Sequence, residues 1–440
     1  MNKKKQPKKP KKTAPPTKTL KTKLRHLPKA DFAILREMTH HAKNLYNQAL
    51  YAIRQHREAT GKYLPYEKVD VLMKQTLNLE GACNYGFLKA GVSQQILRKL
   101  DKNFRSFFAS HKDFAKNPHK YTGKPKPPQY VRENHANLIF DYQRFTIKRE
   151  ADGSEIAVLD KKTALGIPIP SALAGKRIVQ IELIPRFSYF EACFAYRDVE
   201  AKAQVPESER TMAIDCGLNN LATCVTNGVI KPFVVSGKPI KSVNQHYNKV
   251  AATKKSTLKK RHDKDWSAAL DRLTYRRQTR ISDYLHKASR AIVNRCLEHQ
   301  IATVVIGNVA SSTRNINLGK RTNQNFVGLS LGQFVKKLTY KLEAHGITVI
   351  VREESYTSRA SFIDDDPMPK AYTPKSEAVF CGTRIRRGLY KSKNGRLINA
   401  DVNGAYNILR KETVKDSFAA LAEQTLDTVA GWLHPCTLAV

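Results

Sequence analysis

Acidic side chains end or precede three short apolar segments in the second half of this chain. Asp215 closes the first segment, and the pair Glu353 and Glu354 follows the second. Asp401 stands just before a helical pattern. In one α/β layer these carboxylates would meet at one edge of a sheet. Carboxylate oxygens are ligands that Mg²⁺ prefers, and paired Mg²⁺ ions cut phosphodiester bonds, so these acids are candidate metal ligands.

The chain is strongly basic. Lysine and arginine number 77 against 38 aspartates and glutamates, a formal net charge of +39 over 440 residues. Such a charge repels itself unless a polyanion neutralises it, which predicts a nucleic-acid partner. The charge is spread along the chain rather than collected on one amphipathic helix, which argues against a membrane as partner. A ribosomal or packaging protein remains an alternative on composition alone.

Cysteine usage and hydropathy indicate a reducing compartment and no membrane segment. The 7 cysteines include no CxxC pair, which predicts no disulfide framework. No apolar run reaches the length that spans a bilayer. Residues 1–19 are rich in lysine and proline; we expect a disordered arm that screens phosphates, with a nuclear-import sequence as the alternative. The expected location is the cytoplasm, beside a prokaryotic nucleoid, or the nucleus of a eukaryote.

Apolar residues recur at spacings of three and four between residues 28 and 115, which predicts a helical domain. Helices are expected at about 32–53, 66–77 and 93–108, with the apolar stripes forming their common core. Basic side chains on the opposite faces are candidate nucleic-acid contacts: Lys43, Arg54, Arg57, Arg98, Lys102 and Arg105.

A β pattern follows the helices. Residues 116–128, rich in proline, lysine and glycine, indicate a linker. From 138 to 197 the apolar period changes to two, and Asp152-Gly153 is a hairpin-turn dipeptide. This predicts a small β domain, with a barrel as its expected form. Alternation over 19–27 predicts one further, isolated strand.

The region 206–411 predicts an α/β fold. Apolar runs at 212–215 and 221–226 are expected to pair as a hairpin. A long helical region follows and carries Arg276 and Arg277 as further candidate nucleic-acid contacts. The other expected elements are helices at 238–300, 329–345 and 402–410 and strands at 303–306 and 347–351. This order suits an RNase H-like fold, whereas the tail, 412–440, shows only a weak helical pattern.

Three stretches of this region, 213–223, 352–358 and 399–408, resemble the TnpB family of RNA-guided nucleases. Insertion sequences encode that family, which is related to the compact type V CRISPR effectors. The resemblance runs in order from about residue 20 to 411. It implies a multidomain α/β protein with an RNase H-like (RuvC) nuclease core.

The resemblance also implies a domain order and a set of partners. Residues 20–27 and 116–205 would form a wedge β domain, and the helical part, 28–115, would be a recognition domain inserted into it. The nuclease domain would cover 206–411. The implied partners are a guide RNA and a target double-stranded DNA, held in a monomeric ribonucleoprotein.

The second of the three acids that the family uses in its nuclease site is not at its usual position in this chain. Most relatives have a glutamate where this chain has Gly307. This implies either an inactive nuclease or a metal-binding acid that another segment of the chain supplies. Glu353 and Glu354 end the next strand, and alternation sends them to opposite faces, so one of them is expected to serve. We favour Glu354. Asp215, Glu354 and Asp401 would then hold two Mg²⁺ ions, although Asp401 is also a residue type that caps helices.

Many relatives carry a four-cysteine zinc ribbon where this chain has residues 355–393. Only Cys381 remains here, and Ala360 and Ile363 stand where cysteines are expected, so we expect no zinc. Three consecutive acids at 364–366 are expected to lie in a solvated loop. The basic residues that follow are candidate phosphate contacts, with a plain basic loop as the alternative: Arg384, Arg386 and Arg387.

Other functions remain open. Charge supports nucleic-acid binding directly, whereas guidance by RNA rests on the resemblance alone. Gly307 motivates a guided binder without cleavage, which would act as a repressor. A structural RNA-binding protein would bind RNA tightly and cut nothing, and a DNA transposase or integrase would share the fold and the acids but join strands.

Overall fold

The computed structural model describes residues 17–24, 27–160, 163–197, 207–228, 230–308, 330–369, 379–412 and 431–440. The chain divides into two compact units, residues 1–200 and 201–440. None of the described helices is both long enough and apolar enough to cross a membrane.

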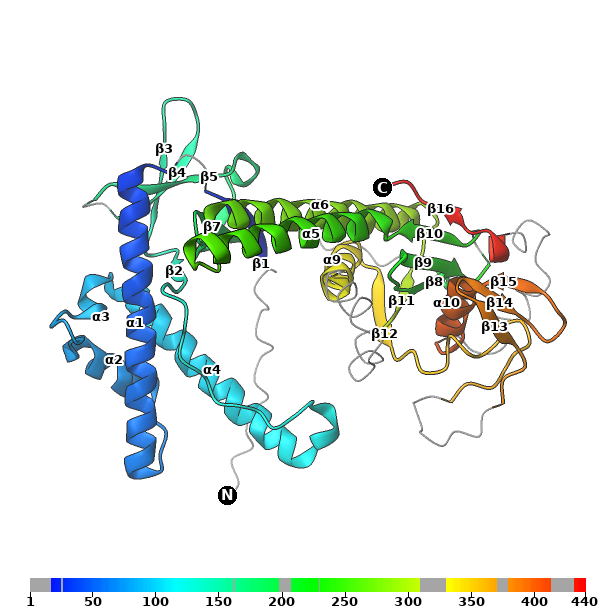
Figure 1. Ribbon diagram of the computed structural model, residues 1–440, viewed down its shortest axis with the longest axis horizontal. Helices are drawn as coiled ribbons and strands as arrows, with labels where there is room; N and C mark the ends of the chain where they lie inside the picture. The colour runs from blue at the N-terminus through cyan, green and yellow to red at the C-terminus, as the bar shows by residue number, and fades with distance from the viewer. Residues whose placement is uncertain are drawn as a thin grey trace, which may run out of the picture. The chain divides into compact units, whose positions relative to one another are not determined.

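Helices of the first unit follow the predicted periodicity. They are α1 (Lys29–Thr60), α2 (Tyr66–Gln75), α3 (Asn84–Phe87) and α4 (Ala90–Lys116) (Figure 1). Their apolar stripes are buried in one core that also takes in strand residues. The long helix α1 ends at Gly61, whose φ of 69° lets its N–H donate back to the carbonyl of Arg57. The three predicted helices are confirmed.

Strands of the first unit form two sheets. The first has the order β1-β7-β6-β2, all antiparallel, and the second the order β3-β4-β5. The strands are β1 (Thr17–Lys23), β2 (Leu138–Asp141), β3 (Thr146–Arg149), β4 (Glu155–Asp160), β5 (Leu165–Ile169), β6 (Arg177–Pro185) and β7 (Phe190–Arg197). Short 3-10 turns lie at Pro118–Lys120 and Ser171–Leu173.

Three features of these sheets bear on the predictions. The Asp152-Gly153 turn does connect β3 and β4, with Gly153 at a φ of 81°. Strand β1 begins at Thr17, so residues 17–19 lie in a paired strand and not in a disordered arm. Residues 1–16 lie outside the described part of the chain. The pairings of the described strands leave β1 and β2 as open edges, so they give two sheets where one barrel was expected.

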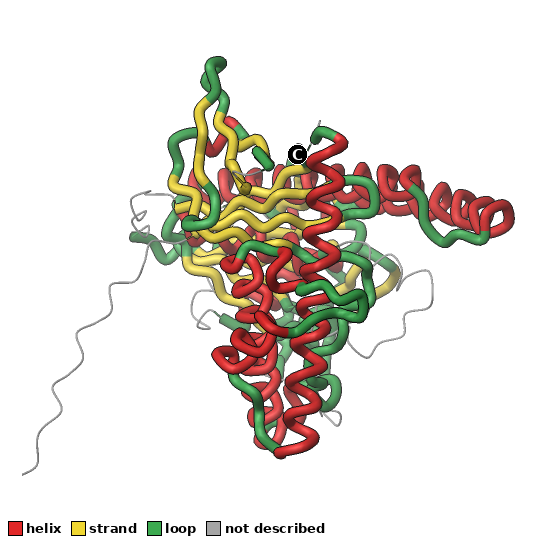
Figure 2. Tube along the Cα trace, turned by 90° about the vertical axis from the view of Figure 1, so that its left-hand side faces the viewer, coloured by secondary structure: helices red, strands yellow, loops and turns green. Residues whose placement is uncertain are grey.

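The second unit is built on a six-stranded sheet of order β12-β11-β8-β9-β10-β16. Strands β8, β9 and β10 are antiparallel neighbours, and β11 and β12 run parallel to β8. Figure 1 labels these strands, and Figure 2 draws the described strands of the chain in yellow and the helices in red. The strands are β8 (Thr211–Asp215), β9 (Asn220–Thr226), β10 (Phe233–Ser236), β11 (Thr303–Gly307), β12 (Thr348–Arg352) and β16 (Cys436–Thr437).

Helices cover both faces of this sheet. Met212 and Ile214 of β8 share a core with α5 (Lys238–His262), α6 (Ala268–Glu298) and α9 (Leu331–Ala344), whereas Ala213 shares a core with α10 (Ala400–Arg410). This is the alternation that a strand buried on both faces requires. The expected single helical region is two helices, because the chain turns at Asp263 with a φ of 49°.

The strand order agrees with the RNase H-like arrangement expected from the sequence. Since β8, β11 and β12 are parallel, their carboxyl ends lie at one edge of the sheet. Sequence patterns missed β10, β16 and a small antiparallel sheet that leads into α10. That sheet contains β13 (Thr383–Arg386), β14 (Leu389–Lys391) and β15 (Leu397–Asn399).

Candidate active site

Asp215 is the last residue of β8, and its carboxylate lies against helix α10. Gly404 makes this approach possible, because a Cβ at position 404 would come within 2.7 Å of Asp215 Oδ2. Burial, reinforced by repulsion from Asp401, raises the pKa of Asp215 to about 7, and the positive charge of Arg384 opposes this rise. Asp215 is therefore a buried carboxylate whose charged form is opposed by burial and by Asp401 and favoured by Arg384.

Asp401 lies in the first turn of α10 but does not cap it. The cap is Asn399, whose Oδ1 accepts hydrogen bonds from the N–H groups of Asp401 (3.0 Å) and Val402 (3.3 Å). The Asp401 side chain instead accepts a hydrogen bond from Nδ2 of Asn220, at 2.8 Å. The alternative role of Asp401 as a helix cap is therefore wrong.

Glu354 follows β12 and lies over the end of the neighbouring strand β11. A Cβ at Gly307 would come within 2.8 Å of both Glu354 Cδ and Ile408 Cδ1. Burial and then repulsion from Asp215 raise the pKa of Glu354 to about 8. Its Oε1 is buried and has no hydrogen-bond partner among the described residues.

Glu353 has a different environment. Its carboxylate accepts a hydrogen bond from the Ser355 hydroxyl and lies 3.7 Å from Nζ of Lys411. Lys411 also donates to the backbone carbonyls of Glu353 (3.1 Å) and Ser355 (2.7 Å). The structure thus brings Glu354 against Gly307 and beside Asp215, and leaves Glu353 to its ion pair with Lys411.

The charge of Asp215 interacts with that of Asp401 and with that of Glu354, so the three acids form one cluster. The donors are all hard carboxylate oxygens, and one of them is buried without a partner, which is a setting that a divalent cation would stabilise. As the side chains stand, however, no three His, Cys, Asp or Glu groups in the described ranges are placed to enclose a metal ion. The type of ligand atom and the pairing of the acids therefore suit a divalent cation, whereas the described side chains do not surround a single metal position.

Candidate nucleic-acid contacts on the first unit divide into exposed and engaged side chains. Arg57, Arg98 and Lys102 are exposed. Arg105 is exposed too but is paired with Asp101 at 2.8 Å. Arg54 donates to the carbonyl of Pro128 (2.8 Å) and lies over the Tyr130 ring, so part of its role is to hold the linker against α1. Lys43 is half-buried and donates to Asn44.

Candidate contacts on the second unit divide in the same way. Arg276 is exposed on α6, whereas Arg277 donates to Oδ1 of Asn244 (2.7 Å) and lies over the Tyr247 ring, which ties α6 to α5. The basic side chains of β13 and the following turn are exposed: Arg384, Arg386 and Arg387. Of these, Arg384 places its charge near Asp215.

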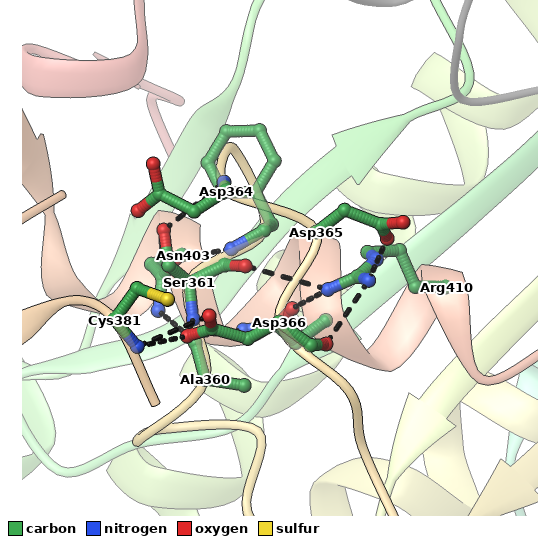
Figure 3. Close-up of polar contacts among 10 residues, drawn as sticks. Ala360, Ser361, Asp364, Asp365, Asp366, Cys381, Asn403 and Arg410 are labelled. Carbon is green, nitrogen blue, oxygen red and sulfur yellow. Dashed lines mark hydrogen bonds and ion pairs between the residues drawn. The ribbon is translucent and has the colours of Figure 1, made fainter. Parts of the chain in front are cut away.

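The acids at 364–366 correct one prediction. Asp366 is only 1% exposed, and its carboxylate accepts hydrogen bonds from the N–H groups of Ser361 (2.7 Å) and Cys381 (3.1 Å) (Figure 3). Asp365 forms an ion pair with Arg410 of α10. The prediction of a solvated loop is therefore wrong for Asp366, whose carboxylate joins Ser361 and Cys381, whereas the Asp365 side chain is 67% exposed. Residues 370–378 lie outside the described part.

One residue of the site was not singled out from the sequence, and two others were noted only as part of the family-like stretches. Asn220, Gly404 and Lys411 each contact or make room for one of the acids or for Glu353. Asn220 and Gly404 fall inside the stretches that carry the family resemblance, and that position was the available signal. Lys411 comes just after α10 and has no sequence signal of its own.

Comparisons with known proteins agree with this architecture. Residues 194–313 match the family OrfB_IS605, described as a probable transposase, and residues 332–408 match a Cas12f1-like TNB domain. A putative RNA-guided DNA endonuclease, InsQ of Escherichia coli (strain K12), is 22% identical over 390 residues, which cover 83% of this chain and 85% of InsQ.

A solved structure shares the fold. The cryo-EM structure of a Cas12f1–sgRNA–target DNA complex matches with a TM-score of 0.51 at 14% identity, covering 87% of this chain and 83% of that chain. At this identity the match concerns the fold alone.

Proposed function

Because the chain is a TnpB-like protein, we propose that it is an RNA-guided DNA endonuclease with a RuvC-like active site. The observation that carries this proposal is the buried carboxylate of Asp215 at the carboxyl edge of the sheet, close enough to Asp401 and to Glu354 for their charges to interact. Glu354 fills the space at Gly307 from which most relatives supply their glutamate. The same chemistry is thus available from a different strand.

Asp215, Glu354 and Asp401 would hold two Mg²⁺ ions, which when bound would activate the attacking water and stabilise the leaving oxygen. The chain's own residues prepare the site. Asn220 fixes one Asp401 oxygen through its hydrogen bond. Arg384 brings a positive charge to the acid cluster from an exposed strand, where a phosphate could also reach it.

The chain has 77 basic and 38 acidic residues, and this excess of positive charge would hold nucleic acid. In this proposal a guide RNA supplies sequence specificity through base pairing, while the protein reads a short DNA motif and the backbone shape. The relevant exposed side chains are Arg57, Arg98, Lys102, Arg276, Arg384, Arg386 and Arg387. We further propose a monomeric ribonucleoprotein that acts on nucleoid DNA in a prokaryotic cytoplasm, or in the nucleus of a eukaryote.

The test is cleavage by the protein copurified with RNA from its native locus. A DNA library that matches this RNA is incubated with Mg²⁺ or with EDTA. Wild type should cut only with Mg²⁺, and Asp215→Ala or Glu354→Gln should lose cutting while guided binding persists. Glu353→Gln is the matched control, because Glu353 is paired with Lys411, and it should retain cutting.

Other outcomes would favour the alternatives. Guided binding without cutting by the wild type would indicate a programmable repressor, which the departure at Gly307 and the incomplete convergence of the acids favour. Joined DNA strands would indicate a transposase, the description given to the family matched by residues 194–313. RNA binding with no guided DNA binding would indicate a structural RNA-binding protein.

A further inference from the structure

Glu354 lies beyond the end of strand β12, so no sheet pairing fixes its backbone directly. Its position depends on the turn that follows. Thr357 donates twice to the carbonyl of Glu354, from its N–H at 3.2 Å and from Oγ1 at 2.9 Å. Thr357 is 5% exposed, so these bonds are shielded from water. The geometry of Glu354 therefore depends on where Thr357 is held.

Asn407 of helix α10 holds Thr357. Its Nδ2 donates to the carbonyls of Thr357 (2.9 Å) and Ala360 (2.7 Å), and its Oδ1 accepts from Arg410 at 3.0 Å. Asn407 is fully buried, and each polar atom of its amide has a partner. One side chain thus fastens the turn at two points.

Asn403, one turn earlier on α10, fastens the next part of the same segment. Its Nδ2 donates to the carbonyl of Ala360 (2.8 Å), and its Oδ1 accepts from the N–H of Phe362 (3.1 Å). Figure 3 shows Asn403, Ala360 and Arg410 together with the loop acids. Among the described residues Asn403 makes no hydrogen bond to Thr357, and this separates its role from that of Asn407.

Helix α10 therefore contacts the site at several points. It carries Asp401, it makes room for Asp215 at Gly404, and Ile408 packs beside Gly307, where Glu354 lies. Asn407 is next to Ile408 in sequence. Both donors of this buried amide are used, and loss of Asn407 would remove its buried bond to the Thr357 carbonyl, whereas Ala360 would keep its bond from Asn403.

We propose that Asn407 is a positioning residue for Glu354, acting through Thr357. The inference rests on the proposed nuclease function and adds that α10, which already carries Asp401, also sets the place of the acid from the neighbouring strand. A glutamate outside regular structure would then be held almost as firmly as one within a strand.

The test compares Asn407→Leu, Thr357→Val and Thr357→Ser in the complete protein–RNA complex. Thr357→Val removes the hydroxyl bond to Glu354 without changing the side-chain shape, and Thr357→Ser keeps the hydroxyl. Outer-shell partners typically contribute about 10–100-fold to metal affinity or activity. Asn407→Leu and Thr357→Val should therefore raise the Mg²⁺ concentration for half-maximal cleavage by about 10-fold, and Thr357→Ser should stay near wild type.

A second readout does not depend on cleavage. Mg²⁺ should raise the Tm of the wild type, and in the same variants this rise should need a higher Mg²⁺ concentration. Guided DNA binding in EDTA should stay unchanged. Asn403→Leu is the matched control on the same helix, since it should lower the Tm without the shift in Mg²⁺ dependence.

The outcomes separate this inference from the proposed function. If the wild type neither cuts DNA nor gains Tm with Mg²⁺, both fail. If the wild type cuts but Thr357→Val matches Thr357→Ser in Mg²⁺ dependence, the positioning role is overturned and the nuclease stands. This pair decides the question even if Asn407→Leu does not fold.

Discussion

The carboxylate of Glu354 occupies the space into which a side chain at Gly307 would project. Gly307 is the last residue of β11, and Glu354 lies just beyond the end of β12, the parallel neighbour of β11 in the sheet. A glycine at 307 is therefore a packing requirement of the Glu354 position, and the two residues act as one arrangement for supplying the middle acid.

A methyl group at position 307 should displace Glu354. Overpacking a buried site costs about 1–3 kcal/mol of stability. Because the displaced group is a proposed metal ligand, Gly307→Ala should also slow cleavage by about 10–100-fold, the usual effect of disturbing the surroundings of a metal ligand. Cleavage kinetics of the guided complex measure this effect. Gly332→Ala is the control, because a Cβ there meets nothing within 4 Å. Wild-type cutting by Gly307→Ala would show that Glu354 is not needed at this place.

The metal-free protein should lose stability as the pH rises. Burial raises the pKa of Asp215 to about 7 and that of Glu354 to about 8, whereas unfolded carboxyl groups titrate near about 4. Between those values the folded protein binds protons that the unfolded chain has released, so the free energy of unfolding falls from about pH 4 to about pH 8. Denaturation in EDTA across this range measures the slope.

Matched variants test which carboxyl group is responsible. Glu354→Gln cannot titrate and should flatten the upper part of this pH dependence, whereas Glu353→Gln should change it less, because burial and Asp215 contribute more to the raised pKa of Glu354 than Glu353 does. Equal slopes in all three proteins would contradict the buried position of Glu354.

Asp366 should stabilise the fold, and this stability should not require zinc. Asp366→Ala removes the carboxylate that accepts the Ser361 and Cys381 N–H groups, and hydrogen bonds to charged groups contribute about 1.5–3 kcal/mol each. The Tm should fall clearly, whereas Asp365→Ala, at an exposed ion pair, should change stability by less than about 1 kcal/mol. A zinc chelator should leave the wild-type Tm unchanged. A chelator-induced fall would mean that this region binds metal.

Removal of residues 1–16 should lower the salt dependence of nucleic-acid binding. This segment carries many lysines, and each lost phosphate contact reduces the slope of log K against log salt by up to about 0.9. The deletion should stop at residue 16, because β1 begins at Thr17 and pairs with β7. Binding titrations at several salt concentrations measure the slope, and a slope equal to that of the full chain would mean that the arm touches no phosphate.

Local patterns were sufficient for the elements whose apolar residues repeat regularly. The periodicity of α1 and α4, the Asp152-Gly153 turn and the β8–β9 hairpin are properties of neighbouring residues, so the sequence predicts them. Asp215 and Asp401 were also identified from the sequence, because Asp215 ends a strand pattern and Asp401 stands at the start of a helix pattern. Short or weakly patterned strands such as β10 and β13 gave no comparable signal.

Contacts between distant segments needed the tertiary structure. The sequence placed Glu353 and Glu354 at the end of the next strand and favoured Glu354, but only the pairing of β11 with β12 brings Glu354 over Gly307 and leaves Glu353 to Lys411. The burial of Asp366 is of the same kind, because its partner N–H groups lie 5 and 15 residues away. From sequence alone a carboxylate is expected to be solvated. Whether it is buried depends on the hydrogen-bond donors that folding brings to it.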